Sequence, residues 1–446
     1  MLGAAFALLT SAWPQAATAQ GQPAYELSLG EAARMAAQRQ ASVEAAQYQV
    51  AQAEARVTQS RSALFPQISA DISQTGRTFN TATFGIDFPS SPGEPPLFNP
   101  NGQVEGPVRL LDLRGAVRQP IVDFSTWRQI DRAQAGVDVT EAQTSAIAEQ
   151  AAFTATVAYL ATSHADERYR NLLADKELAQ DLLQIARAQL KAGVGVDLDV
   201  TRAEARLAAV QARLVAAEND RNRSRLDLLR TLNLPLDTRI ELTDSLSNLA
   251  PTDLQVQTGA AVERALQNRP ELKVLRETVD ATRAQMSAIR AERYPTLGLV
   301  ADDGFIGKTP AHLLNTYDWG FSVTVPLFSG NRVGGQLEEQ RARLNELDVR
   351  YQDQLAQIRY EVRKARGDLA SAKEQVEAAR TRLRLAEQEV AQAQQRFQTG
   401  VAGNADVITA MLSLSDARMM LTNAFTAYQS ARVNLARSEG IVTALP

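Results

Sequence analysis

Apolar residues recur with two different periods along this chain, and the change of period separates predicted helices from predicted strands. Residues 121–234 and 327–445 contain no proline and are rich in Ala, Leu, Glu, Gln and Arg, which are strong helix formers. We therefore expect one helix over residues 125–190 and another over 332–397, each about 100 Å long. Helices of this length need neighbours along their whole length, as in a bundle or coiled coil.

Strict alternation marks shorter segments that lie beside prolines. Residues 319–325 read Trp-Gly-Phe-Ser-Val-Thr-Val, and residues 68–73 read Ile-Ser-Ala-Asp-Ile-Ser. This alternation predicts strands of roughly 8–11 residues, paired as two hairpins within residues 66–120 and 295–328. One face of each hairpin is apolar and the other is small or polar. The apolar face would cover a core in a water-soluble sheet, or face lipid around a polar lumen in a membrane barrel.

The chain is a tandem duplication. Residues 30–66 align without a gap with residues 259–295, a shift of 229 at both ends. Residues 193–200 and 400–407 repeat the pattern Gly-x5-Asp-Val with a shift of 207. The smaller shift reflects extra residues in 79–107, whose Pro, Gly and Asn content is typical of an exposed loop.

The duplication sets the expected domain boundaries. The first repeat covers residues 20–258 and the second covers 259–446. Each reads helix, β-hairpin, long helix, tight turn and returning helix, with the turns at residues 191–199 and 398–406. The first repeat ends in an additional segment, 233–258. The expected fold is therefore mainly α-helical with a small β part.

Two hairpins supply four strands, which are too few to close a barrel alone, because the smallest barrels have about eight. Open sheet edges in lipid would leave unpaired backbone groups at several kcal/mol each. A dimer would bring eight strands and a filled interior, whereas a trimer would bring twelve.

Composition removes several classes of function. The chain has no cysteine and a net charge of −4, so thiolate chemistry is excluded and nucleic-acid binding has no electrostatic support. The two histidines, His164 and His312, lie far apart in sequence without a zinc motif. No Walker loop or nucleophile elbow is present. We predict that the protein is not an enzyme and holds no cofactor or metal.

The first 19 residues read as a secretory signal peptide. An apolar run over residues 2–9 precedes Ala17-Thr18-Ala19, which fits a small-residue cleavage site. No Lys or Arg precedes the run, so we expect the true start to lie upstream. No later stretch of 18 or more uncharged apolar residues predicts a transmembrane helix.

Several motifs, in order and at repeat spacing, carry a family resemblance. Residues 265–272 read Ala-Leu-Gln-Asn-Arg-Pro-Glu-Leu, residues 293–295 read Arg-Tyr-Pro, and residues 325–330 read Val-Pro-Leu-Phe-Ser-Gly. Together with the paired turns and the duplicated plan, they make the chain resemble the TolC-like outer-membrane efflux family over almost its whole mature length.

The resemblance implies a homotrimer in outer-membrane lipid, with a 12-stranded β-barrel and a long periplasmic α-helical barrel. Residues 233–257 would join a belt near the middle of the helices. The implied function is the exit duct of a tripartite efflux or type I secretion system, conducting substrate passively. Its implied partners are a periplasmic membrane-fusion adaptor and, indirectly, an inner-membrane pump of RND or ABC type.

The two turns are the main candidate sites. Asp199 and Asp406 begin the returning helices, where an N-capping role alone is one interpretation. The resemblance implies a second one, in which Asp406 is an acidic gate residue and Asp199 a latch residue, and rings of Asp narrow the pore and favour cations. The departures are Phe397 and Ala402, which cannot form the Tyr and Arg latch of some relatives.

Adaptor docking is expected at the same turns, with packing within the turn as the alternative interpretation. The residues concerned are Gly193, Val194, Gly195, Val196, Gly400, Val401, Gly403 and Ala405.

The hairpins carry two further sets of candidates. Tyr317, Trp319 and Phe321 are expected near the outer end of a strand as membrane-interface aromatics, with core packing as the alternative. Arg114 and Arg118 alternate with apolar neighbours and would face the lumen. Asp302-Asp303-Gly304 reads as an exposed hairpin loop.

A coiled-coil protein of the periplasm or cell surface, with a structural or adhesive role, is the alternative function. The alternating hairpins argue against it, because a coiled-coil stalk needs no amphipathic strands at matching places in two repeats.

Overall fold

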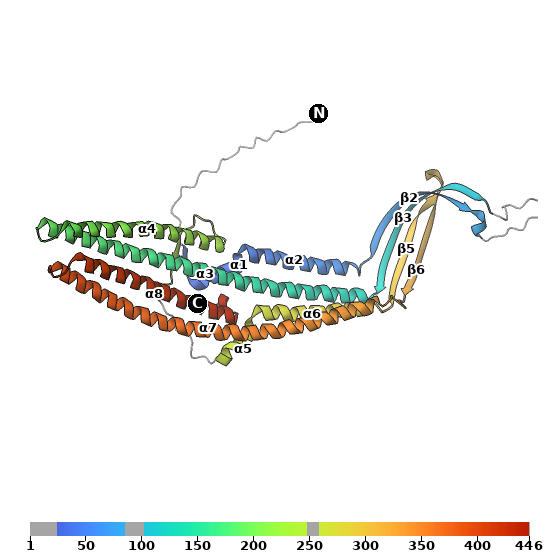
Figure 1. Cartoon of the computed structure of the whole chain (residues 1–446). Coiled ribbons are helices and arrows are strands. Elements are labelled where there is room, and N and C mark those ends of the chain that lie inside the picture. Colours follow the sequence, from blue (N-terminus) through green and yellow to red (C-terminus); the bar gives the residue numbers. More distant parts are fainter. Residues whose placement is uncertain (1–24, 85–101, 248–257, 446) are drawn as a thin grey trace, which may run out of the picture. The chain divides into compact units, whose positions relative to one another are not determined.

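The computed structural model describes residues 25–84, 102–247 and 258–445, and is mainly helical with one four-stranded sheet (Figure 1). The expected signal peptide, part of the loop 79–107 and part of the segment 233–258 lie outside these residues. Among the helices so described, none combines the length and the hydropathy that crossing a membrane requires. The elements, in order, are β1 (Tyr25–Leu27), α1 (Leu29–Arg39), α2 (Ala41–Ser62), β2 (Gln67–Asn80), η1 (Thr81–Phe84), β3 (Val104–Val122), α3 (Phe124–Lys191), α4 (Asp197–Thr231), β4 (Ile240–Leu242), α5 (Thr258–Asn268), α6 (Pro270–Ala291), β5 (Thr296–Gly307), η2 (Pro310–His312), β6 (Leu313–Thr324), α7 (Arg332–Gln398), α8 (Asn404–Glu439) and η3 (Val442–Ala444).

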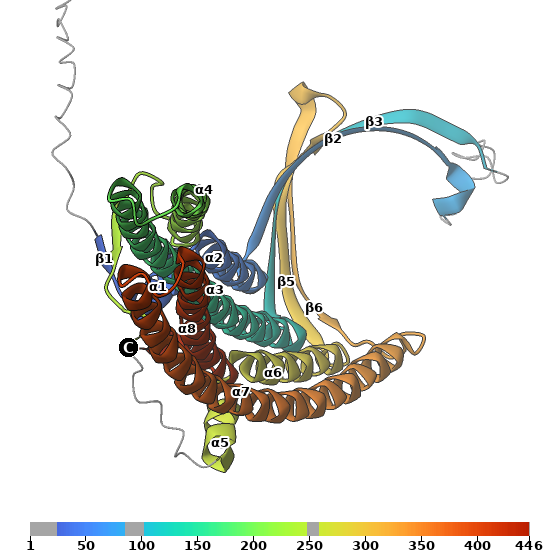
Figure 2. The same ribbon diagram turned by 60° about the vertical axis from the view of Figure 1, so that its left-hand side comes forward.

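The described residues fall into two compact units, and α3 and α7 contribute to both. The first unit contains two helical hairpins, α3 with α4 and α7 with α8, whose helices lie side by side (Figure 2). Their apolar stripes meet in one cluster that includes Leu182, Val390, Phe397, Val407 and Met411. Many of the other buried positions are alanines, which let the helices approach closely.

Tyr159 joins the middle of α3 to the short parallel pair β1–β4. Its hydroxyl donates to the carbonyl of Leu27 at 3.1 Å and accepts from the main-chain N–H of Asp244 at 3.2 Å. The side chain is only 1 % exposed. Burial raises the pKa of the Tyr159 phenol well above its ordinary value, so the hydroxyl stays protonated and can keep donating.

The duplication is visible in the short helices. Each repeat opens with two helices where the sequence predicts one continuous stretch, so that expectation is wrong in detail. The breaks fall at Gln40 and Arg269, both extended residues and both at the same place in their repeat. Pro270 explains the second break, because proline has no N–H to continue a helix and is tolerated at a first turn.

The second unit contains the sheet, α2, α6 and the first parts of α3 and α7. One apolar cluster joins α2 to α3 through Val57 and Val137, and another joins α6 to α7 through Met286 and Val333. Helix α3 begins at Phe124 because Asp123 caps it: the Asp123 carboxylate accepts the N–H groups of Ser125 at 2.9 Å and Thr126 at 3.1 Å.

The four long strands form one antiparallel sheet in the order β2-β3-β5-β6. With 14, 19, 12 and 12 residues they exceed the expected 8–11. Strand β3 runs through Pro120 to Val122, with a register shift between these residues. A bulge of this kind lets a proline stay in a strand without breaking the ladder around it.

Candidate functional sites: the helix turns and the two-faced sheet

The turn after α3 is a Schellman motif. Gly193 has φ of +77°, its N–H donates to Leu190 O at 3.0 Å, and the N–H of Val194 reaches back to Gln189 O at 3.1 Å. These bonds satisfy carbonyls that the helix end leaves free. Glycine at this position removes the steric cost of a left-handed conformation.

The turn after α7 repeats this geometry. Gly400 has φ of +73°, its N–H donates to Phe397 O at 3.1 Å, and the N–H of Val401 donates to Arg396 O at 2.9 Å. Both of these bonds in the first turn have a counterpart 207 residues later, so the duplicated sequence pattern encodes a duplicated backbone conformation at the helix ends.

The N-capping interpretation of Asp199 and Asp406 is wrong. Helix α4 begins at Asp197 after the extended residue Val196, and α8 begins at Asn404 after the extended residue Gly403. Neither preceding residue makes a side-chain cap. Both aspartates therefore lie inside the first turn, where a carboxylate interacts favourably with the helix dipole.

The turns expose apolar side chains. Val194 is 79 % exposed and Val401 is 71 % exposed; Val196 and Ala405 are also exposed, as are Gly193, Gly400 and Gly403, whereas Gly195 is half-buried. Packing within the turn, the alternative interpretation, therefore does not explain why apolar side chains occur at Val194 and Val401. Asp406 is exposed, whereas Asp199 is half-buried with Arg202 at 3.9 Å.

Two side-chain bonds connect the two hairpins near their turns. Asn404 Nδ2 donates to Asp199 O at 2.6 Å, and Gln189 Nε2 donates to Phe397 O at 3.2 Å. Asn404 is fully buried, and its Oδ1 has no hydrogen-bond partner within the described chain. Sequence reasoning missed both residues, although Asn at the start of a helix was a usable signal. Phe397 is 3 % exposed and lies in the apolar cluster.

The strand register gives the sheet two distinct faces. Residues directly opposite one another share a face, so Ile68, Val117, Ala301 and Trp319 form one row across all four strands. Moving along β2 toward its C-terminal end, the next row on that face contains Ala70, Gly115, Asp303 and Tyr317. The row after it contains Ile72, Leu113, Phe305 and Asn315.

The opposite face is polar. Its rows include Ser69, Ala116, Asp302 and Asp318, and then Asp71, Arg114, Gly304 and Thr316. The alternation in sequence thus becomes a mainly apolar face, whose polar members Asp303 and Asn315 bond to each other, backed by a polar face.

Arg114 and Arg118 both lie on the polar face. Arg114 on β3 pairs with Asp302 on β5 and donates to Thr316 Oγ1 on β6 at 3.1 Å. The expected loop at Asp302-Asp303-Gly304 is wrong, because these residues lie within β5 and the connection to β6 follows at Pro310–His312. The side chains of Asp302 and Asp303 are held by Arg114 and Asn315 on neighbouring strands.

Tyr317, Trp319 and Phe321 share the apolar face but lie along the middle of β6, not at its end, which corrects the expected position. They are 72 %, 63 % and 65 % exposed. Trp319 and Phe321 meet edge to face with centroids 6.3 Å apart. Core packing is excluded for side chains this exposed, and a large exposed apolar face marks a surface for lipid or another chain.

Long paired helices in the same chain as a sheet with one mainly apolar face are the fold of solved outer-membrane channels. The fold is that of the Campylobacter jejuni outer membrane channel CmeC, with a TM-score of 0.73 at 16% identity over 92% of this chain and 85% of CmeC.

Residues 32–234 and 261–440 match the family model "Outer membrane efflux protein", one match per repeat. The chain belongs to this family of outer-membrane export channels, which extend into the periplasm.

Two relatives carry the names of secretion proteins. The alkaline protease secretion protein AprF of Pseudomonas aeruginosa is 22% identical over 342 residues, covering 73% of this chain and 69% of AprF. The proteases secretion protein PrtF of Dickeya chrysanthemi is 26% identical over 257 residues, covering 56% of this chain and 55% of PrtF. The family match supports an export channel over a coiled-coil structural or adhesive protein.

Proposed function

We propose that three copies of this chain form a closed, 12-stranded barrel in the outer membrane and a continuous duct into the periplasm. The observation that carries the proposal is the four-stranded, two-faced sheet, whose edges are β2 and β6. In hydrocarbon the edge strands need partners for their backbone groups. Pairing β6 of one copy with β2 of the next satisfies both edges and leaves none open.

Within this trimer the apolar face, with Tyr317, Trp319 and Phe321, faces outer-membrane lipid, and the polar face lines the lumen. Arg114 and Arg118 are then lumen residues. The charged groups of the polar face remain hydrated there, whereas their transfer to lipid would cost several kcal/mol.

The duct is passive and acts as the exit of a tripartite efflux or type I secretion system. A periplasmic adaptor docks on the turns, where the exposed Val194 and Val401 supply apolar contacts, and it connects the duct to an inner-membrane pump of RND or ABC type. The names of AprF and PrtF favour protein export. The first turns of α4 and α8 form the periplasmic gate, in which rings of Asp406 and Asp199 favour cations.

Single-channel recording in planar bilayers tests the conduit and the gate. Wild-type protein is expected to give a cation-selective conductance, and Asp406→Asn is expected to reduce the selectivity for cations. Asp181→Asn is the matched control, because Asp181 is an exposed acid on α3 away from the turns. A conductance that does not respond to Asp406→Asn would overturn the gate role, and the absence of any conductance would overturn the channel.

Crosslinking tests the trimer. The chain has no native cysteine, so pairs introduced in the edge strands, for example at Ser69 and Ser322, can be joined with a short bis-maleimide. Covalent species up to, and not beyond, three chains are expected on denaturing gels. A pair at Ala116 and Asp302, which lie opposite each other within one chain, is the control and should give no oligomer. Oligomers absent from a full scan of β2 against β6 would contradict the proposed pairing.

A further inference from the structure

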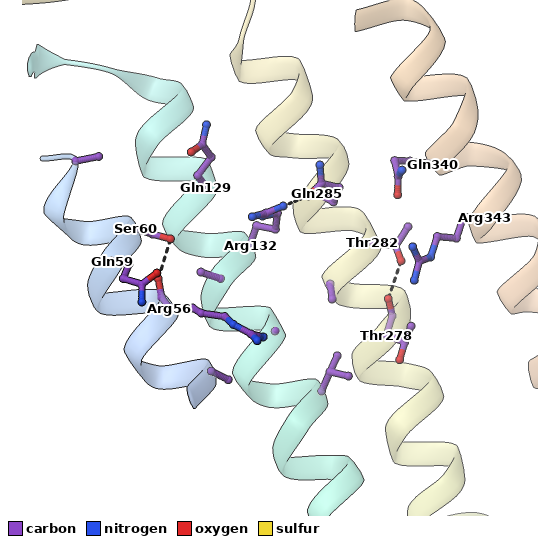
Figure 3. A pocket seen from close by; sticks show the side chains of 16 residues that line it. Arg56, Gln59, Ser60, Gln129, Arg132, Thr278, Thr282, Gln285, Gln340 and Arg343 are labelled. Carbon is purple, nitrogen blue, oxygen red and sulfur yellow. Dashed lines mark hydrogen bonds between the residues drawn. The ribbon is translucent and has the colours of Figure 1, made fainter. Parts of the chain in front are cut away.

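The second unit has an open cavity of about 770 Å³ between the helices α2, α3, α6 and α7 (Figure 3). Among the described residues, its lining includes three arginines, Arg56, Arg132 and Arg343, and no Asp or Glu. This excess of positive charge lies in a chain whose net charge is −4. The cavity is therefore positively charged, whereas the chain as a whole carries a net negative charge.

The arginines come from three different helices and point into the grooves between neighbouring helices. Arg56 projects from α2 toward α3, and Arg343 projects from α7 toward Thr282 on α6 (Figure 3). Arg132 reaches from α3 to α6, where its Nη1 donates to Gln285 Oε1 at 2.9 Å. The helix packing thus gathers guanidinium groups that the sequence separates by up to 287 positions, from 56 to 343.

The other lining residues keep the cavity open without neutralising it. Small side chains, among them Ala53, Ala133 and Ala281, form its apolar part. Gln59, Gln129 and Gln340 add uncharged amide groups to the same wall.

Other arginines of this unit are already paired with acids on their own helices. Arg128 lies 3.0 Å from Asp131, Arg283 lies 2.8 Å from Asp280, and Arg341 pairs with Glu338. Within the part of the chain that the structure describes, Arg56, Arg132 and Arg343 form no such ion pair. Their charge is therefore available to an external anion.

We propose that this cavity is a binding site for oxyanions, taking the carboxylate or phosphate groups of small solutes. A guanidinium group donates two parallel hydrogen bonds to either group and keeps its charge at every physiological pH. Three guanidinium groups on separate helices suit a solute with more than one anionic group. The assignment deepens the proposed function and rests on it in one respect: if the cavity faces the duct, the site lies on the export path.

Calorimetry on the purified protein in detergent tests the site, with citrate as the multivalent probe and inorganic phosphate as the simple one. The variant R56Q/R132Q/R343Q is expected to bind citrate at least about tenfold more weakly than wild type. R128Q/R283Q/R341Q is the matched control, because it removes the same charge from arginines that are already paired. Equal citrate binding by wild type and both variants, or no binding by wild type, would overturn the site.

Gly136 offers a second, independent variant. It lines the cavity, and a Cβ atom added there meets nothing within 4 Å. Gly136→Glu places a carboxylate among the arginines and is expected to weaken citrate binding, whereas Gly136→Gln, of nearly equal size, is expected to leave more of it. Equal weakening by both variants would indicate obstruction of space and count against recognition of charge.

Planar bilayers separate this site from the channel itself. Citrate on the periplasmic side is expected to reduce the wild-type current and to affect R56Q/R132Q/R343Q less, with the conductance of the variant retained in chloride. Current without any response to citrate would overturn the placement of the site in the duct while the channel stands. Citrate binding by a protein that forms no channel would overturn the proposed function and leave the site.

Discussion

The side-chain amide of Asn404, at the start of α8, donates to the main-chain carbonyl of Asp199, in the first turn of α4, over 2.6 Å. The bond joins the returning helices of the two repeats next to both turns. Asn404 is fully buried, and its bond to the half-buried Asp199 is part-buried. The two helical hairpins are thereby held together at the place where the proposed gate lies.

Asn404→Ala should loosen this connection. The expected cost is about 1 kcal/mol, because the carbonyl of Asp199 loses a donor in a part-buried bond, and the conductance in planar bilayers is expected to rise. Thr409→Ala is the control, because its hydroxyl bonds only to Ala405 O of its own helix at 2.9 Å. An unchanged open probability in Asn404→Ala would show that this bond does not restrain the gate.

The backbone conformation requires glycine at one position of the second turn and not at another. Gly400, with φ of +73°, is expected to lose ~1–2 kcal/mol of stability on substitution by alanine. Gly403 lies three residues away with φ of −75° and with nothing within 4 Å of an added Cβ, so Gly403→Ala should cost less than Gly400→Ala, because it weakens only the N-cap of α8. Thermal unfolding of the two variants in detergent measures the difference, and equal effects would refute the argument from conformation.

The stability that Asp123 contributes as the cap of α3 depends on pH. Burial opposes its ionisation, but hydrogen bonds from Ser125 and Thr126 outweigh burial and hold the pKa of Asp123 below its usual value. Its contribution is therefore complete above the unfolded pKa of ~3.9 and is lost as pH falls through the lower folded pKa.

We expect Asp123→Ala to cost about 1 kcal/mol at pH 7, and the difference from wild type to shrink below pH ~4. Asp123→Asn keeps an acceptor oxygen and should lose less at pH 7. Unfolding midpoints measured across pH ~3 to ~8, in steps of about 0.5 pH units, provide the measurement. A difference between wild type and Asp123→Ala that stays constant down to pH ~3 would contradict it.

For Tyr159 we expect the opposite pH dependence: its contribution to stability is lost at alkaline pH. Its folded pKa is raised by burial, so its contribution is complete below the unfolded pKa of ~10 and is lost as pH rises toward the folded value. Tyr159→Phe should cost about 1 kcal/mol at neutral pH, because the N–H of Asp244 loses its acceptor. The gap between the variant and wild type should then narrow above pH ~10. A gap that widens with pH in chemical unfolding would argue against a buried neutral hydroxyl.

Local physical chemistry predicted the long helices and the alternating strands well. The proline-free stretches rich in Ala and Leu became α3 and α7, whose ends lie within one residue of the expected ones. The alternation around Ile68 and Trp319 became a sheet with one apolar face. Both signals are visible in sequence because burial or lipid contact acts on each residue at the period of its own element.

The errors arose where distant residues decide the outcome. Asp302-Asp303-Gly304 has the composition of a turn, yet Arg114 on another strand and Asn315 hold it inside β5. The pair β1–β4 joins residues 215 apart through only three residues per strand, too short for any periodicity. Asn404 and the arginine cavity depend on which helices become neighbours, which no local pattern specifies.

The paired bonds near the turns also constrain the lengths of the hairpins. Asn404 to Asp199 and Gln189 to Phe397 fix both hairpins to the same level along the bundle. Seven residues added to α3 and α4 alone would carry their turn about 10 Å past the other one, breaking both bonds. An insertion in the helical hairpin of one repeat therefore preserves these two bonds only when the hairpin of the other repeat lengthens by the same amount.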